Sequence, residues 1–273
     1  MAPTSCTSTS GAEADLVHPN VVTRYPVLLH GFTGASTSWG HRVVDGLASA
    51  GLAPVLVDLP GHGRHAAEVD PSSFTLRAAL DLVSRAGDWP ADLIGYSMGG
   101  RLALHFAAER PASVRRLVIE SASPGLATEA ERCARRDADE GTASHIETEG
   151  VEAFIDLWER LPLFASQVSL PYEVRLGHRS HRLRNSATGL AGALRGLGTG
   201  VLPSLWDRLP EITCPTLVLV GEHDAKFVDV GKLMAAKMPR ATLVIVPDAG
   251  HTVHLERPEA WLAAVGSFLA EAS

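Results

Sequence analysis

The stretch that decides the fold is ADLIGYSMGGR, residues 91–101. The apolar run Ala91–Tyr96 is typical of a buried strand, and the Ala/Leu-rich segment from Arg101 to Arg110 is typical of a helix. Gly95-Tyr96-Ser97-Met98-Gly99 lies between them, a G-x-S-x-G pattern whose small glycines let strand and helix approach closely. A serine at such a turn sits on strained backbone with its hydroxyl exposed, so Ser97 is a candidate catalytic residue. The alternative is an ordinary glycine-rich turn.

Further apolar runs alternate with helix-like segments on both sides of this stretch. They are Tyr25–His30, Ala53–Asp58, Arg116–Ser121, Thr216–Val220 and Thr242–Val246. Continuous apolar strands spaced by helices predict a mostly parallel sheet covered by helices on both faces, an α/β fold.

The segment from about Gly125 to Pro203 differs, because it contains no convincing strand and is mainly helical in pattern. Its candidate helices are Glu129–Glu140, Val151–Arg160 and Ala187–Leu197. We therefore expect residues 21–124 and 204–273 to form the α/β core, residues 125–203 to form an inserted helical cap, and residues 1–20 to be a flexible tail.

Two later residues could activate the serine, which is a poor nucleophile or base alone. Asp224 follows the strand Thr216–Val220, and His251 follows Thr242–Val246, so both should lie at the same sheet edge as Ser97. The order Ser, Asp, His is the order expected in this kind of fold. An unrelated turn aspartate and a surface histidine are the alternatives, and Glu222, His223 and His254 are less favoured neighbours.

The loop His30-Gly31-Phe32-Thr33-Gly34 follows the first strong strand. In such folds this loop donates one backbone N–H to an oxyanion hole, beside the N–H of the residue after the serine. The expected donors are Phe32 and Met98, and the alternative is a tight glycine turn. We expect His62 and His65 to shape the neighbouring loop rather than take part in the chemistry.

Composition excludes several classes of protein. The chain has 273 residues, 45% hydrophobic and 20% charged, which is typical of a globular protein with a sizeable core. The net charge of −7 argues against a nucleic-acid binder or a basic membrane-surface protein. No stretch is long and apolar enough for a membrane span, and residues 1–20 do not resemble a signal peptide. Three widely separated cysteines favour a reducing compartment, so we expect a cytoplasmic location.

Together these motifs resemble the α/β-hydrolase superfamily over nearly the whole chain. More specifically, they resemble the 2-succinyl-6-hydroxy-2,4-cyclohexadiene-1-carboxylate synthases of menaquinone biosynthesis, over roughly Pro26 to Pro258. The resemblance is carried by these motifs: HGFTG, DLPGHG, GYSMGGR, ESASPGL with Glu131, Arg132 and Arg135, Trp158 with PLFAS, Arg182 with Asn185, GTG with PSLW, GEHDAKF, and AGHTVHLERP. The serine turn and the histidine motif alone indicate only the superfamily, whereas the arginine-bearing cap motifs and GEHDAKF are specific to the synthases.

This resemblance implies a lyase that eliminates pyruvate from a cyclohexene bearing three carboxylates. By the resemblance, Ser97, activated by His251 and Asp224, takes the proton next to the succinyl ketone. Electrons then shift through the ring double bond and expel enolpyruvate. The Phe32 and Met98 amides would hold the ketone oxygen, and the reaction would require no metal or organic cofactor.

The resemblance also assigns Tyr96, Arg101, Arg135, Trp158 and Arg182 to a small anionic, multi-carboxylate substrate. Of the 24 basic residues 21 are arginine, which codon bias could explain, but forked guanidinium groups also match carboxylates bidentately. For each arginine the alternative is a solvated surface ion pair, and for Trp158 it is simple cap core. Arg132 and Arg136 are expected on the helix surface.

Two other functions stay open at this point. A serine hydrolase acting on an ester, a thioester or a carbon–carbon bond would use the same triad, although a lipid-esterase cap should be apolar rather than rich in arginine. A catalytically silent ligand receptor is the other, and an intact Ser–Asp–His set argues against it. The sequence leaves a monomer and a small homo-oligomer equally open.

Overall fold

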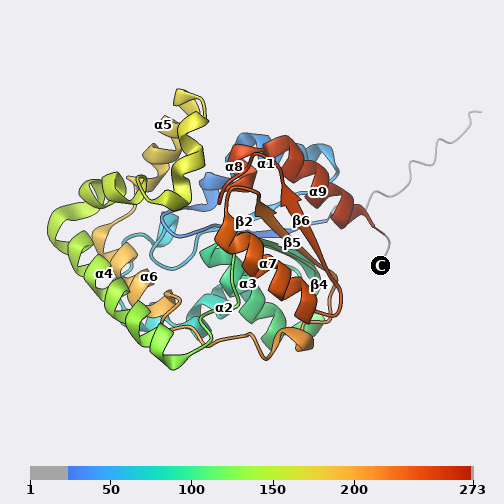
Figure 1. The fold of residues 1–273 in the computed structure, drawn as a ribbon, viewed down its shortest axis with the longest axis horizontal. Helices are drawn as coiled ribbons and strands as arrows, with labels where there is room; N and C mark the ends of the chain where they lie inside the picture. Colours follow the sequence, from blue (N-terminus) through green and yellow to red (C-terminus); the bar gives the residue numbers. More distant parts are fainter. Residues whose placement is uncertain (1–23, 272–273) are drawn as a thin grey trace, which may run out of the picture.

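The computed structural model describes residues 24–271, and its centre is a six-stranded parallel sheet in the order β2-β1-β3-β4-β5-β6. Figure 1 shows this twisted sheet with helices packed around it. The strands are β1 (Val27–Leu29), β2 (Val55–Val57), β3 (Ala91–Tyr96), β4 (Val114–Glu120), β5 (Thr216–Gly221) and β6 (Ala241–Val246). All six coincide with predicted apolar runs, and the α/β fold class is confirmed.

The parallel register brings the carboxyl ends of the strands to one edge. Leu29 of β1 pairs with Gly95 of β3, and Gly95 pairs with Ile119 of β4. Ile119 in turn pairs with Val218 of β5. The loops that follow β1, β3, β5 and β6 therefore leave the sheet at the same edge, where ligands bind in open α/β sheets.

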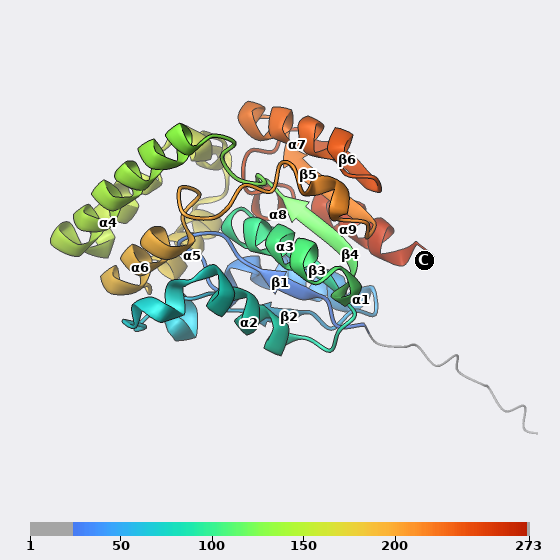
Figure 2. The same cartoon turned by 90° about the horizontal axis from the view of Figure 1, so that it is seen from below.

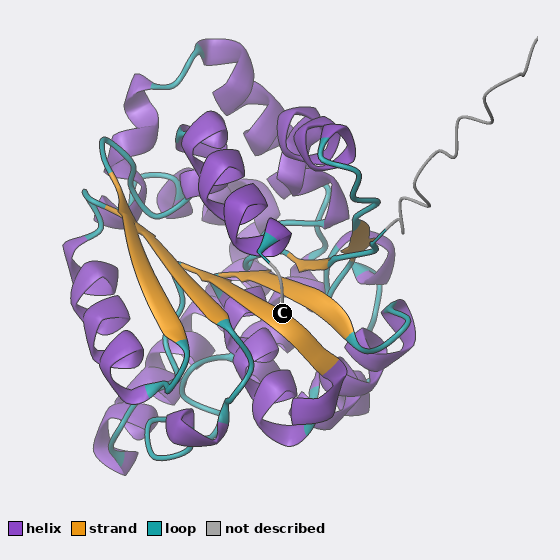
Figure 3. Cartoon of the chain, turned by 90° about the vertical axis from the view of Figure 1, so that its right-hand side faces the viewer, coloured by secondary structure: helices purple, strands orange, loops and turns teal. Residues whose placement is uncertain are grey.

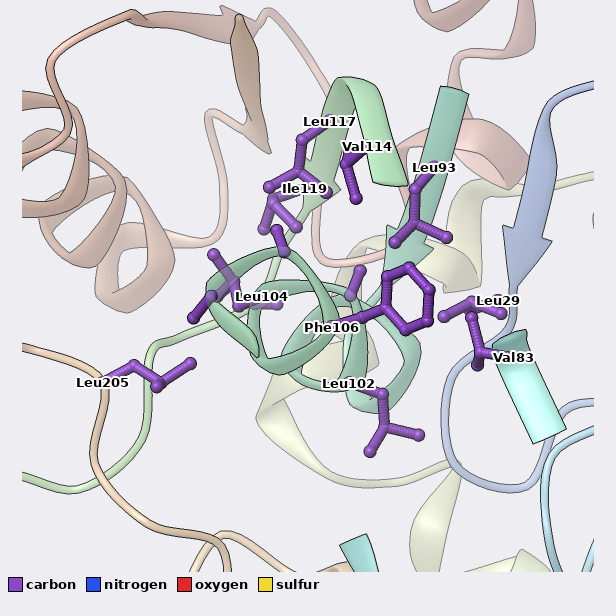
Figure 4. Packing of buried hydrophobic residues seen from close by; sticks show 14 of the residues in the cluster. Leu29, Val83, Leu93, Leu102, Leu104, Phe106, Val114, Leu117, Ile119 and Leu205 are labelled. Atoms are coloured by element: carbon purple, nitrogen blue, oxygen red, sulfur yellow. The ribbon is translucent and has the colours of Figure 1, made fainter. Parts of the chain in front are cut away.

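Helices cover the sheet on both faces, as Figure 3 shows. Each covering helix turns an apolar stripe toward the strands. One face carries α2 (Leu76–Ala86), α3 (Met98–Glu109) and α7 (Ala225–Lys237), and the other carries α1 (Gly40–Ser49), the short α8 (Val253–Glu256) and α9 (Pro258–Ala270). In the larger core cluster, Phe106 of α3 lies beside Leu93 of β3 and Leu29 of β1 (Figure 4), and Leu102 and Leu104 of the same helix belong to that cluster.

Residues between β4 and β5 form a separate helical layer. It consists of α4 (Glu129–Trp158), α5 (Tyr172–Arg182), α6 (Ala187–Leu197) and the 3₁₀ helix Pro162–Ser169. Figure 2 shows α4 and α6 side by side, away from the sheet. Their shared core contains Ala143, Ile146, Phe154, Ile155, Leu190, Ala191 and Leu194. This layer is where we expected the cap.

The helices of this layer differ in part from the expected ones. Ala187–Leu197 matches α6. Within α4 two helical segments meet at the non-helical Gly150, so the separation of the helices expected at 129–140 and 151–160 is confirmed, although the first segment continues to residue 149. Gly150 has φ 85° and ψ 169°, a conformation that glycine adopts without a Cβ penalty. The sequence did not predict α5. The expected tail, residues 1–20, lies outside the described residues.

Within residues 24–271, no helix is both long enough and apolar enough to cross a membrane.

Candidate active site

Ser97 occupies a sharp turn between β3 and α3. Its backbone has φ 51° and ψ −109°, a strained conformation for a residue with a side chain. Glycines make the turn possible, because a Cβ on Gly95 would lie 2.5 Å from the carbonyl oxygen of Gly99. A Cβ on Gly99 would clash with the carbonyl group of Leu29 in β1. The turn therefore holds the serine at the carboxyl edge of the sheet and ties it to β1.

The side chains of Ser97, His251 and Asp224 form a continuous hydrogen-bonded chain. His251 Nδ1 lies 2.6 Å from Asp224 Oδ2, and His251 Nε2 lies 3.2 Å from Ser97 Oγ. With its proton on Nδ1, His251 donates to Asp224, and Nε2 is left to accept the serine hydroxyl proton. His251 and Asp224 are both buried, so their bond is shielded from water. The structure thus brings together the three residues expected to form the triad.

Close packing of two loops aligns the acid with the base. Asp224 and His251 follow β5 and β6, and the His223 N–H donates to the Ala249 carbonyl at 2.8 Å. Gly221 lies so close to Gly250 that it has no room for a Cβ. Glu222, one of the less favoured neighbours, is exposed and accepts a hydrogen bond from the Asp248 N–H.

Two backbone N–H groups beside the serine are free to bind an anion. Within residues 24–271, neither the Phe32 N–H nor the Met98 N–H donates a hydrogen bond to the protein. Phe32 lies in the loop after β1, and the Gly99 N–H, one residue beyond Met98, donates to the His30 carbonyl at 3.0 Å. The loop and the helix start are thus tied together as an oxyanion hole requires.

Two buried histidines hold the Phe32 loop, and His30 was not singled out for this role by the sequence. His62 Nε2 accepts the Thr33 N–H at 3.2 Å, and His30 Nε2 accepts the Leu59 N–H at 3.0 Å. Both rings must be neutral to accept in this way. Burial lowers the pKa of His30 to about 4 and that of His62 to about 3, so neither becomes charged at neutral pH.

Aromatic side chains from the core and the cap surround the triad. The ring of Tyr96 lies 5.5 Å from that of His251, and its hydroxyl is 2.7 Å from Thr252 Oγ1. The indole of Trp158 packs 5.4 Å from the Phe32 ring, and its buried N–H has no partner in the described residues. Trp158 is therefore both a cap core residue and a free donor next to the proposed oxyanion hole.

Arg182 adds a buried positive charge to this group. Its Nη1 donates to Glu159 at 3.0 Å, and its guanidinium lies 5.1 Å from the centre of the Phe164 ring. Phe164 in turn packs against His251, with ring centroids 6.0 Å apart. The Arg182 Nε–H is buried without a partner in the described part of the chain, so it can bind an anion entering beside the triad.

A second cluster lies between α3 and the cap. It contains Arg101 of α3 and both Arg135 and Asp139 of α4. Arg135 Nε donates to Asp139 at 2.7 Å, and within residues 24–271 Arg101 reaches only the Leu197 carbonyl, at 3.5 Å. Burial and the charge of Arg135 lower the pKa of Arg101 to about 10, so it stays positively charged at neutral pH. Arg132 and Arg136 instead pair with Glu129 on the surface of α4.

Comparisons with known proteins show which family the chain resembles. Residues 27–265 match the model of the alpha/beta hydrolase family. A Bacillus subtilis (strain 168) protein provisionally named as a 2-succinyl-6-hydroxy-2,4-cyclohexadiene-1-carboxylate synthase is 42% identical over 89% of both chains. The synthase of Klebsiella pneumoniae is 33% identical over 90% of this chain and 94% of its own length.

The chain belongs to this synthase family, within the α/β hydrolases. Its fold is also that of a solved structure of MenH from S. aureus, with a TM-score of 0.85, 37% identity, and coverage of 92% of this chain and 95% of that one. An esterase from Thermogutta terrifontis, solved with malate bound, is similar at a TM-score of 0.76 and 28% identity over 90% of this chain and 89% of its own.

The Phe32 loop and the cap enclose a small cavity beside this site. A cavity of about 20 Å³ lies between the Phe32 loop and the cap, enough for about one water molecule. Tyr96, Phe164, Arg182 and His254 line it together with that loop. In the described residues no group of three His, Cys, Asp or Glu side chains could hold a metal ion.

Proposed function

We propose that this protein is a lyase that acts on 2-succinyl-5-enolpyruvyl-6-hydroxy-3-cyclohexene-1-carboxylate. It eliminates pyruvate and leaves 2-succinyl-6-hydroxy-2,4-cyclohexadiene-1-carboxylate. The observation that carries this proposal is the 42% identity to a family member over 89% of both chains, combined with a Ser97–His251–Asp224 chain at hydrogen-bond distances.

In the reaction, Ser97 acts as a base rather than as an acyl nucleophile. Its oxygen takes the proton on the ring carbon beside the succinyl ketone, while its own proton passes to His251 Nε2. Asp224 stabilises the imidazolium that forms. The electron pair of the broken C–H bond moves through the ring double bond, the carbon–oxygen bond to the enolpyruvyl group breaks, and a proton restores pyruvate from the departing enolate.

The free amides of Phe32 and Met98 would stabilise the charge that develops on the ketone oxygen. Donors already aimed at that position need no rearrangement during the reaction, which is why such groups lower barriers strongly. Neutral His30 and His62 keep the Phe32 loop in place for this.

The substrate carries three carboxylates, and the arginines supply matching charge. We assign Arg182 and the Trp158 N–H to the part of the substrate nearest the triad, because both donors are buried without a partner in residues 24–271. Tyr96 shapes the same wall, and Arg101 and Arg135 bind another carboxylate. Charge-assisted bonds of this kind are about twice as strong as neutral ones.

A serine hydrolase is the second candidate, favoured by the 28% identity to a solved esterase and by the shared triad. The test is incubation of the enzyme with the enolpyruvyl substrate, with pyruvate release followed by a coupled reductase. We expect release by the wild type and, in Ser97→Ala, a loss of about a thousandfold with unchanged thermal unfolding. No release of pyruvate, together with rapid hydrolysis of a short-chain ester, would identify a hydrolase instead.

A further inference from the structure

One buried acid stands between two arginines of the site and is not used by the chemistry. Asp139 lies on α4, and its side chain is only 7% exposed, whereas the side chain of Arg135, one turn before it, is 44% exposed. An ion pair four residues apart on a helix surface normally contributes little. This pair differs because its carboxylate is buried. A buried carboxylate stays ionised only when positive charge lies beside it.

The two oxygens of Asp139 have different surroundings. Oδ1 accepts the Arg135 Nε–H at 2.7 Å, while Oδ2 is buried with no donor in the described residues. Gly198, at the end of α6, closes one side of Oδ2, since a Cβ there would lie 2.5 Å from it. Burial raises the pKa of Asp139, and the charges of Arg135 and Arg101 oppose that rise. The acid is therefore fixed between α6 and the two arginines.

The arginines keep their forked ends available. Arg135 uses only Nε, so within residues 24–271 both of its Nη groups remain without an acceptor. The Nε–H of Arg101 is buried with no partner in the same residues, and only its Nη2 reaches an acceptor, at 3.5 Å. Two guanidinium groups and one carboxylate leave one net positive charge, which a single carboxylate of the substrate would neutralise.

We propose that Asp139 is a positioning residue: it fixes Arg135 through Nε and balances Arg101, so that both present donors to one substrate carboxylate. Without this counter-charge the two guanidinium groups would repel each other and lose their shared orientation. Preorganised donors bind more tightly because less order is lost on binding. The inference rests on the proposed function, in which these arginines bind the substrate.

The test compares Asp139→Asn, which removes the charge and keeps the shape, with Glu140→Gln. Glu140 is the next residue of α4 and pairs with Arg195 in an exposed ion pair, so it is a matched control. We expect Asp139→Asn to raise KM about tenfold, the effect of one charge-assisted hydrogen bond, with kcat changed less than about threefold. Glu140→Gln should leave both constants unchanged. A loss of kcat with unchanged KM in Asp139→Asn would overturn the proposal.

A double-variant comparison tests whether Asp139 acts through Arg135. If it does, Asp139→Asn combined with Arg135→Ala raises KM by less than the product of the two single effects. Fully multiplicative effects would show that the acid acts independently, against the proposal. Turnover by the wild type distinguishes a failure of the proposed function from a failure of the role of Asp139. Absence of pyruvate release contradicts the proposed function and not the role of Asp139.

An NMR measurement tests the role of Asp139 even if the wild-type enzyme releases no pyruvate. In the free protein, the Arg135 Nε–Hε proton should give an NMR signal protected from solvent exchange, assigned by its disappearance in Arg135→Lys. This signal should lose protection in Asp139→Asn and keep it in Glu140→Gln. A rapidly exchanging Arg135 Hε in the wild type would overturn the placement on which the proposal stands.

Discussion

At the scale of single residues, the account depends on which nitrogen of His251 carries the proton. Asp224 accepts the Nδ1–H of His251, so Nε2 of His251 faces Ser97 as an acceptor. In the described residues no hydrogen bond joins the acid to the serine, so Asp224 acts through His251, by fixing the ring and its tautomer and by stabilising the imidazolium that forms. This makes the contribution of Asp224 separable from that of negative charge in general, because Glu222 lies two residues away in the same loop.

Asp224→Asn should reduce pyruvate release by a hundredfold or more, since an amide that donates to Nδ1 favours the wrong tautomer. Glu222→Gln is the matched control, and its turnover should stay within about twofold of wild type because, in the described part of the chain, the Glu222 carboxylate accepts only from the Asp248 N–H. Steady-state kinetics of the two purified variants measures this. Equal losses in both would show that Asp224 acts by bulk charge and would contradict its assigned role.

Residue patterns predicted that Ser97, Asp224 and His251 lie together, as they do in the structure, but did not predict the buried polar contacts. Ser97, Asp224 and His251 each follow a predicted strand, so the geometry of a parallel sheet alone places them at one edge. Asp139 gave no signal, because it lies in a charge-rich helix where acids usually face water. The role of His30 was equally hidden, since it depends on the N–H of Leu59, a residue that is distant in sequence.

At the scale of elements, the cap helices show where periodicity fails. The helix α5 was not predicted, because its sequence YEVRLGHRSHR is largely polar and only Arg182 among its residues is buried. Residues 141–150 of α4 were also left out, although Ala143 and Ile146 pack against α6. In the α4 segment, contacts with α6 rather than a regular apolar stripe stabilise the helix.

Two glycines of α4 give an opposite pair of predictions. Gly150 has φ 85° and Gly141 has no such positive φ, yet a Cβ at either position would have no neighbour within 4 Å. Gly150→Ala should therefore destabilise the protein by about 1–2 kcal/mol through backbone strain alone. Gly141→Ala should stabilise it by about 0.5–1 kcal/mol. Urea unfolding checks both, and the same sign for the two substitutions would contradict the bend at Gly150.

At the scale of the whole molecule, buried histidines make the free energy of unfolding depend on pH. Burial lowers the pKa of His30 to about 4, of His62 to about 3 and of His105 to about 4. Their pKa values in the unfolded chain are about 6.5, so below that pH the unfolded state binds more protons. The stabilisation is thus complete above about pH 6.5 and is lost as the pH falls toward 4.

Near pH 5 the three groups together should lower the free energy of unfolding by about 4 kcal/mol for each pH unit of acidification. Urea unfolding at pH 7, 6 and 5 measures this slope. In His105→Leu, which removes one titrating group from α3, the slope should be smaller by about 1 kcal/mol for each pH unit. A free energy of unfolding that stays constant from pH 7 to pH 5 would show that these rings are not buried as neutral groups.

The central claim is that a hydrolase-type triad performs an elimination here, and the ring product of the reaction tests it most directly. The enolpyruvyl substrate is incubated with the enzyme in ¹⁸O-labelled water, and the ring product is examined by mass spectrometry and ultraviolet absorption. Elimination by Ser97 predicts a conjugated diene, formed together with pyruvate and carrying no new hydroxyl group. A ring product that keeps its single double bond and bears a hydroxyl group in place of the enolpyruvyl ether would show hydrolysis and contradict the account; this hydroxyl is unlabelled if water attacks the enol carbon and labelled if water attacks the ring carbon.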